Sequence, residues 1–151
     1  MTFTDTSIAQ QERNMEVFRR LIEEGFSRGH TAIVDEVLAP DCVEHQVGVT
    51  PANAEGVKGS IAFLHQLFPD LRVTIEDMAA AGDRVWARLC GRGTHRGPIM
   101  GMPPSGNTVT VNIMDLCRFE QGKIVEHWGV PDTFAMFAQM GISLRPPQSR
   151  A

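Results

Sequence analysis

The stretch 109–129, VTVNIMDLCRFEQGKIVEHWG, has the alternation of two strands joined by a tight turn. Apolar side chains recur at every second position from Val109, and the same face continues to Asp115, Cys117 and Phe119. A period of two is typical of a strand with one buried face. Glu120-Gln121-Gly122 then turns the chain, so residues 123–129 are predicted to return beside the first strand as an antiparallel hairpin.

Two earlier stretches have the same period of two. Residues 71–75 alternate between apolar and polar side chains, and residues 85–90 repeat the pattern after a turn at Ala81-Gly82-Asp83. The N-terminal part instead has apolar residues three and four positions apart. This spacing predicts helices over about 7–28, 33–38 and 57–68. Thr31 can cap the second helix, a short strand can follow at 41–46, and Pro131 can open a short last helix.

The order of these elements predicts an α+β fold with a single domain over residues 1–151. Helices come first and hairpin-linked strands follow, so we expect helices packed on one face of a mainly antiparallel sheet. Glycines in the strands predict a strongly curved sheet, with the N-terminal helices on its concave face around a pocket. The segment 91–106 predicts a long connection, and the Pro-rich tail 145–151 is expected to be loose.

Composition and charge exclude several classes of function. The formal net charge is −4 and the 14 Lys and Arg residues are scattered, so no nucleic acid partner is expected. No apolar run reaches membrane-spanning length and the N-terminus does not resemble a signal peptide, so we expect no membrane partner and a cytoplasmic location. The three Cys residues are far apart and the His residues lack ligand spacing, so neither a disulfide framework nor a metal is expected.

Asp115 is the most informative residue, because it interrupts an otherwise apolar strand face. A buried carboxylate must be paired, hydrogen-bonded or protonated. One interpretation is an Asp near a strand end that is bonded to backbone amides or water. The other interpretation is catalytic: Asp115 is a general base, or it orients a histidine.

His127 is the candidate partner, and the length of the turn decides whether the two residues meet. A three-residue turn pairs Phe119 with Lys123 and places Asp115 directly opposite His127. A two-residue turn places Trp128 opposite Asp115 instead. We expect the three-residue turn, and with it a catalytic Asp115–His127 pair that removes a proton next to a carbonyl group. The alternative is a structural buried ion pair.

Four further residues are candidates for contacting a substrate. His45 lies beside a loop that could form the pocket rim, although it can equally be a surface histidine. His95 lies near the mouth of a hairpin. Trp128 could form a wall of the pocket or part of the core. Asp132 is a carboxylate near the site, or a residue that compensates the dipole of the last helix.

Several motifs resemble those of the SnoaL-like polyketide cyclases and ester cyclases, in the nuclear-transport-factor-2-like superfamily. They are Gly91-Arg92-Gly93-Thr94-His95-Arg96-Gly97, Met100-Gly101-Met102-Pro103-Pro104-Ser105-Gly106 and Gly122-Lys123-Ile124-Val125-Glu126-His127-Trp128, with Asp132 and Gln139-Met140-Gly141 after them. The resemblance covers residues 12–141, and implies one SnoaL-like domain with a cone-shaped fold around a deep pocket. Homodimers or homotetramers are usual in such folds.

The best-known members of this family close a ring in an aromatic polyketide by intramolecular aldol condensation, without a metal or organic cofactor. A pocket carboxylate acts there as acid and base; its position falls on Gly129 here, and a pocket histidine falls on Asp115. The resemblance therefore implies an enzyme that needs no cofactor and acts on a small hydrophobic, polyketide-like carbonyl compound. Asp115 and His127 would take the role of the missing carboxylate.

Two other hypotheses fit the same residues. The Asp–His pair also suits a lyase, isomerase or hydrolase of this fold, and a third possibility is a binding protein for small molecules that does not catalyse. Ketosteroid isomerases and scytalone-type dehydratases share the fold group and use pocket phenols as hydrogen-bond donors. The chain has no Tyr, so their mechanisms are not expected here.

Overall fold

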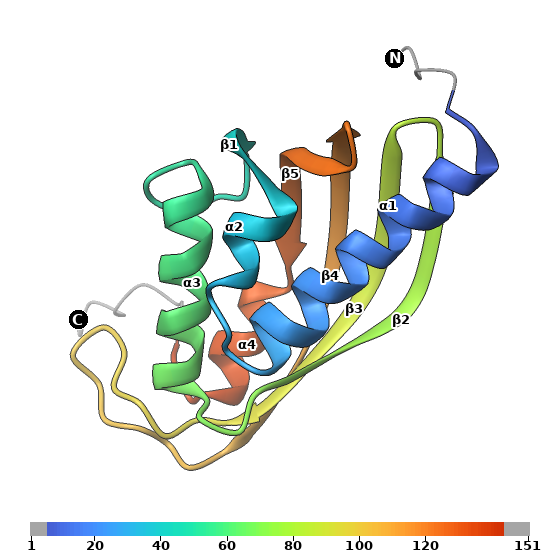
Figure 1. Cartoon of the computed structure of the whole chain (residues 1–151). Helices are drawn as coiled ribbons and strands as arrows, with labels where there is room; N and C mark the ends of the chain where they lie inside the picture. Colours follow the sequence, from blue (N-terminus) through green and yellow to red (C-terminus); the bar gives the residue numbers. More distant parts are fainter. Residues whose placement is uncertain (1–5, 144–151) are drawn as a thin grey trace, which may run out of the picture.

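The computed structural model describes residues 6–143, in which helices lie on one side of a mixed sheet (Figure 1). The helices are α1 (Ile8–Arg20), which runs directly into the π-helical segment η1 (Leu21–Ser27), α2 (Ile33–Val37), α3 (Ala54–Leu67) and α4 (Thr133–Gln139). The strands are β1 (Leu38–Glu44), β2 (Arg72–Ala81), β3 (Arg84–Thr94), β4 (Thr108–Glu120) and β5 (Lys123–Pro131).

Within the described residues the sheet has five strands, in the order β1-β5-β4-β3-β2. β1 runs parallel to β5, and every other pair of neighbours is antiparallel. The predicted α+β class with a mainly antiparallel sheet is therefore confirmed. The parallel pair matters for the site, because it places the end of β1 beside the middle of β5.

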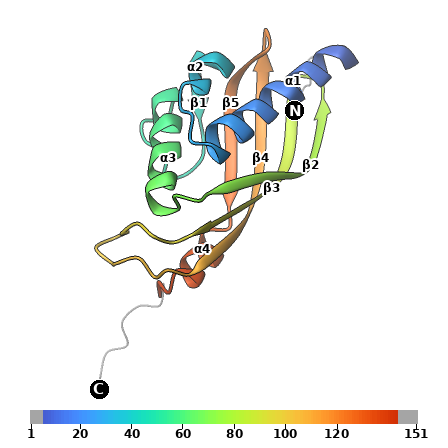
Figure 2. The ribbon, with the colours of Figure 1, turned by 60° about the horizontal axis from the view of Figure 1, so that its bottom comes forward.

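The sheet is not strongly curled, so the prediction of a strongly curved sheet is wrong (Figure 2). Strong bends in antiparallel sheets arise at bulges, where one strand holds an extra residue. The long central β3–β4 ladder has none between its end pairs, Thr94↔Thr108 and Arg84↔Arg118, whereas the β2–β3 and β4–β5 ladders beside it each have one register shift. Gly91 and Gly93, which suggested bending, lie inside this regular ladder opposite Val111 and Val109.

The N-terminal helices cover one face of the sheet. α1 contacts β2 and β3, α3 contacts β1, and α2 lies between α3 and the α1–η1 helix (Figure 1). α4 contacts β4 near the end of the sheet from which residues 95–107 extend (Figure 2). The core lies between helices and sheet, and its most deeply buried side chains include Phe18, Ile22, Val34, Ile61, Val85 and Ile124.

The first helix has the predicted extent, α3 begins three residues before the predicted start, and several other details differ from the prediction. The first helix is capped by Ser7, whose side chain accepts from the Gln10 amide, and it changes to π-helical geometry from Leu21. Thr31 does not cap α2, since the N-cap position is Ala32. Pro131 does not open α4 but ends β5, and the strand predicted at 41–46 is shifted toward the N-terminus. The tail 145–151 lies outside the described residues.

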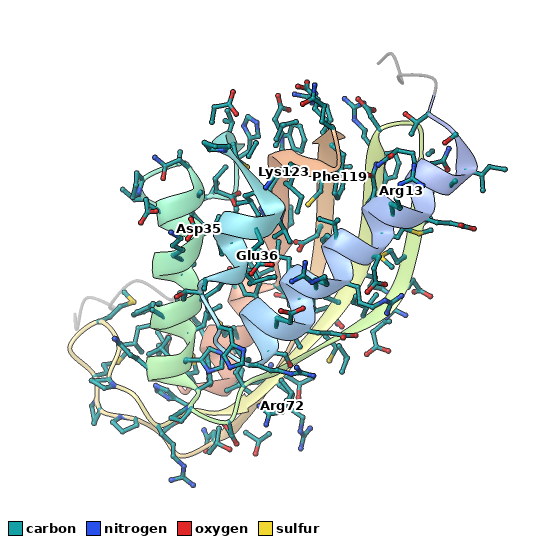
Figure 3. All side chains as sticks on the ribbon, in the orientation of Figure 1. Arg13, Asp35, Glu36, Arg72, Phe119 and Lys123 are labelled. Carbon is teal, nitrogen blue, oxygen red and sulfur yellow. The ribbon has the colours of Figure 1, made fainter. Side chains whose placement is uncertain are left out.

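The start of β5 is attached to the helical layer. Lys123 donates a hydrogen bond to the Glu36 carbonyl oxygen on α2 at 2.8 Å, and the two residues lie close together in Figure 3. This contact helps to fix the position of β5 relative to α2. No helix within residues 6–143 is long and apolar enough to span a membrane.

Candidate active site

A cavity of about 340 Å³ lies between the helices and the inner face of the sheet. Apolar side chains form most of its wall, among them Phe26, Leu64, Leu89, Val111, Ile113 and Phe137. A smaller chamber of about 50 Å³ shares part of this wall, including Asp115 and His127, and it is also lined by Glu44. Four polar residues lie where the two cavities share a wall, namely Gln46, Ser60, Asp115 and His127, whereas Arg92 and Thr133 line only the larger cavity.

His127 on β5 lies between two carboxylates. Its Nδ1 is 2.7 Å from Oε2 and 2.9 Å from Oε1 of Glu44, at the end of β1. Its Nε2 is 3.4 Å from Oδ2 of Asp115 on β4. All three side chains are largely buried, with exposed fractions of 2% for Glu44, 8% for Asp115 and 13% for His127. The structure thus brings together the two predicted catalytic residues and a third that the sequence analysis missed.

The predicted three-residue turn is wrong, and Asp115 lies opposite Gly129 rather than His127. The turn has two residues, Gln121 and Gly122, both with positive φ (49° and 74°), and it pairs Glu120 with Lys123. Two successive residues with positive φ match the right-handed twist of a hairpin better than an ordinary turn does.

A register shift then changes the alignment of the two strands. Between Arg118 and Phe119 the register moves by one residue, because β5 holds the extra residue Val125. His127 therefore lies opposite Cys117, on the same face as Asp115 and diagonally next to it. Diagonal neighbours on one face are within reach of long side chains, which explains the contact despite the wrong register.

Gly129 provides space for this arrangement. A Cβ atom added at Gly129 would lie 2.0 Å from Oε1 of Gln46 and 2.9 Å from Cε1 of His127. Both distances are shorter than real Cβ contacts, so the Gln46 amide lies where a side chain of residue 129 would otherwise be. Gln46 lines both cavities and was not identified from the sequence.

The two carboxylates control the charge of His127. Burial disfavours the charged ring, but the contacts with Asp115 and Glu44 outweigh it and raise the pKa of His127 from 6.5 to about 10. At neutral pH the ring is therefore an imidazolium. An Nε2–H group facing the wall between the cavities can donate a hydrogen bond or a proton to a bound molecule.

Glu44 was missed because its partner is distant in the sequence. Glu44 is in register with His127 through the parallel β1–β5 pair, 83 residues away. The available signal was weak: Glu44 follows Cys42 by two positions and so shares its strand face, but the apolar Val43 between them is exposed and hides the alternation. An acidic residue on the same face as a buried Cys needs a partner, as Asp115 does. The sequence analysis instead selected its neighbour, His45.

The four residues predicted to contact a substrate lie elsewhere. His45 stacks on Trp128, with ring centroids 4.5 Å apart, on the opposite face of the sheet from His127. His95 is 1% exposed, and its Nδ1 is 2.9 Å from Oγ of Ser105. Asp132 caps α4 by accepting from the Ala135 amide. None of the four belongs to the described residues that line either cavity.

Comparison with known proteins agrees with this architecture. The family model of the SnoaL-like polyketide cyclases matches residues 16–140. The chain belongs to the SnoaL-like polyketide cyclase family. Within residues 6–143, no group of three or more His, Cys, Asp or Glu side chains is arranged to hold a metal ion.

Similar members of the family include named ester cyclases. The chain is 26% identical over 134 residues to the aklanonic acid methyl ester cyclase DauD of Streptomyces sp. (strain C5), covering 84% of this chain and 81% of that protein. It is 30% identical over 125 residues to the nogalonic acid methyl ester cyclase of Streptomyces nogalater, covering 77% and 89%.

Solved structures of similar chains share the fold. IdmH of Streptomyces antibioticus superposes with a TM-score of 0.76 at 34% identity, covering 85% of this chain and 99% of that one. TsrD of Streptomyces laurentii superposes with a TM-score of 0.77 at 27% identity, covering 92% and 100%.

Proposed function

We propose that this SnoaL-like protein is a cofactor-independent cyclase that closes a ring in a hydrophobic carbonyl compound by an intramolecular aldol reaction. The observation that carries the proposal is the Asp115–His127 contact in the wall of a cavity of about 340 Å³ that is otherwise mostly apolar. Apolar walls suit a polyketide-like substrate, and a few convergent polar groups fix its orientation. The names of the related ester cyclases support methyl esters of this class as substrates.

The reaction needs an acid and a base at one place. A base removes the proton from a carbon between two carbonyl groups, and the resulting enolate attacks a ketone carbon of the same molecule. The ketone oxygen then takes up a proton, so the product has the mass of the substrate. Asp115 and His127 supply a carboxylate and an N–H donor side by side for these two proton transfers.

The test is turnover of aklanonic acid methyl ester and nogalonic acid methyl ester by the purified chain, followed by mass spectrometry and NMR. We expect a product of unchanged mass with one additional ring. Asp115→Asn and His127→Ala should each lower kcat by roughly 100-fold or more, the usual contribution of a positioned acid or base. Asp77→Asn is the matched control, because Asp77 is an exposed carboxylate on β2 that pairs with Arg88.

The outcomes separate the competing functions. Full activity in both Asp115→Asn and His127→Ala would refute the assignment of the pair. Loss of water from the substrate would indicate a dehydratase, since ring closure alone conserves mass. Tight binding without turnover, unchanged by Asp115→Asn, would indicate a binding protein.

A further inference from the structure

Glu44 is a buried carboxylate that the proposed reaction does not yet use. Its two oxygens lie 2.7 and 2.9 Å from Nδ1 of His127, and Oε1 also accepts the backbone N–H of Gln46 at 2.7 Å. Both oxygens of Glu44 face the same ring nitrogen, and Oε1 already accepts an N–H group. This arrangement favours a proton on Nδ1 of His127, which donates to Glu44.

The second nitrogen of the ring faces the second carboxylate. In a neutral imidazole, a proton on Nδ1 leaves a lone pair on Nε2, which would point toward Oδ2 of Asp115 at 3.4 Å. Two facing lone pairs repel each other, whereas a second proton on Nε2 turns this contact into an attraction. The geometry therefore favours a ring that carries protons on both nitrogens.

Few other charges face the ring. In the smaller chamber that His127 lines, the helices contribute Leu21 and Phe26 from η1 and Val57, Ser60 and Leu64 from α3, which do not titrate. Arg92 of β3 lines the larger cavity, which His127 also lines. On β4, Cys117 lies opposite His127, and burial raises the pKa of this thiol well above its ordinary value. Cys117 thus stays neutral, and Glu44 and Asp115 set the charge of the ring.

We propose that Glu44 is a positioning residue that keeps His127 doubly protonated, so that Asp115 is the base and His127 the proton donor. This assignment rests on the proposed function and specifies which member of the Asp115–His127 pair is the base and which is the acid. It reverses the simplest interpretation of an Asp–His pair, in which the imidazole is the base. The raised pKa of His127 agrees with it.

The proton balance of the reaction then closes. The Asp115 carboxylate takes the proton from the carbon, and the enolate forms the new C–C bond at the ketone carbon. The ketone oxygen takes the Nε2 proton of His127. The proton on Asp115 then passes to Nε2 of His127, 3.4 Å away, and both groups return to their starting states. Oδ1 of Asp115 is buried and has no hydrogen-bond partner among the described residues, so no protein donor competes for this oxygen.

NMR of the chain labelled with ¹⁵N-histidine tests the charge state without any substrate. We expect the His127 ring of the unmodified protein to carry protons on both nitrogens from pH 6 to about pH 9. Glu44→Gln should lower its pKa by at least one unit, and the alkaline limb of the pH–kcat profile should move down by the same amount. Glu126→Gln is the matched control, because Glu126 is a β5 carboxylate whose contacts are Arg118 and His45.

Each outcome is decisive. A neutral His127 ring at pH 7.5 in the unmodified protein would overturn the proposal even if Glu44→Gln fails to fold, and so would an unchanged His127 pKa in a folded Glu44→Gln variant. Absence of a ring-closed product from the unmodified protein would instead refute the proposed function, whatever the His127 titration shows. The two failures are therefore distinguishable.

Discussion

Gly129 leaves space that the side chain of Gln46 occupies, and the position of His127 depends on it. The resemblance places the usual carboxylate of the family at this position, but here the Gln46 amide and the His127 ring leave no room for a side chain. The carboxylates of this site come instead from β1 and β4. At the scale of single residues, the absence of a side chain at position 129 therefore goes together with the presence of carboxylates on β1 and β4.

Substitution at this position tests the coupling. Gly129→Ala should displace the Gln46 amide and push the His127 ring, lowering kcat by about tenfold or more, since small displacements of catalytic groups are costly. The double variant Gln46→Ala/Gly129→Ala should recover part of this loss, because it removes the group that Cβ would meet. Steady-state kinetics of both variants and of Gln46→Ala alone check this. No recovery in the double variant would show that the Gln46 contact is not the cause.

At the scale of elements, α3 offers two glycines in very different surroundings. Gly59 is exposed and a Cβ there would meet nothing within 4 Å, whereas a Cβ at Gly56 would lie 1.8 Å from the Pro51 carbonyl oxygen. Ala is a better helix former than Gly by about 1 kcal/mol. The same substitution in one helix should therefore have opposite effects.

Thermal unfolding of the two single variants measures the difference. Gly59→Ala should raise Tm by roughly 2–4 °C, the shift that about 1 kcal/mol produces in a chain of this size. Gly56→Ala should lower Tm, because the backbone oxygen of Pro51 cannot move aside as a flexible side chain could. An equal rise in Tm for both would show that the loop before α3 adapts at little cost.

The strands also show which parts of an element can be predicted. The period of two located β2 to β5 from local sequence, because alternation depends only on which face of a strand is buried. The register of β4 and β5 could not be predicted, since it depends on a two-residue turn and a bulge at Val125 acting together. With either feature alone, a residue other than Gly129 would lie opposite Asp115.

At the scale of the whole molecule, the buried contacts of His127 with Glu44 and Asp115 make the stability of the fold depend on pH. The pKa of His127 rises from 6.5 to about 10 on folding, so the folded chain binds this proton more tightly than the unfolded chain. The stabilisation is complete below about pH 6.5 and is lost as the pH rises through 10. It contributes at most about 5 kcal/mol to the free energy of unfolding. Burial also raises the pKa of Cys42 to about 12, which reduces stability in the same direction above pH 9.

Urea unfolding between pH 6 and pH 8.5 isolates the histidine from the thiols. The unmodified protein should lose stability steadily over this range, whereas His127→Gln should be nearly independent of pH there. The folded state of each variant is checked by circular dichroism at pH 6. Equal slopes for both proteins would mean that His127 is not responsible for the pH dependence.

The sequence by itself determined the class of fold, the hairpin that carries Asp115 and His127, and the resemblance to the SnoaL-like cyclases. These follow from the period of side chains and from short motifs, which are local properties of the chain. Only the tertiary structure decided the degree of curvature and the partners of His127. Glu44 reaches His127 through a parallel strand pair formed across 83 residues, and Gln46 occupies the space that Gly129 leaves open. Such pairings leave no local pattern, because the free energy that selects them comes from packing between elements that are distant along the chain.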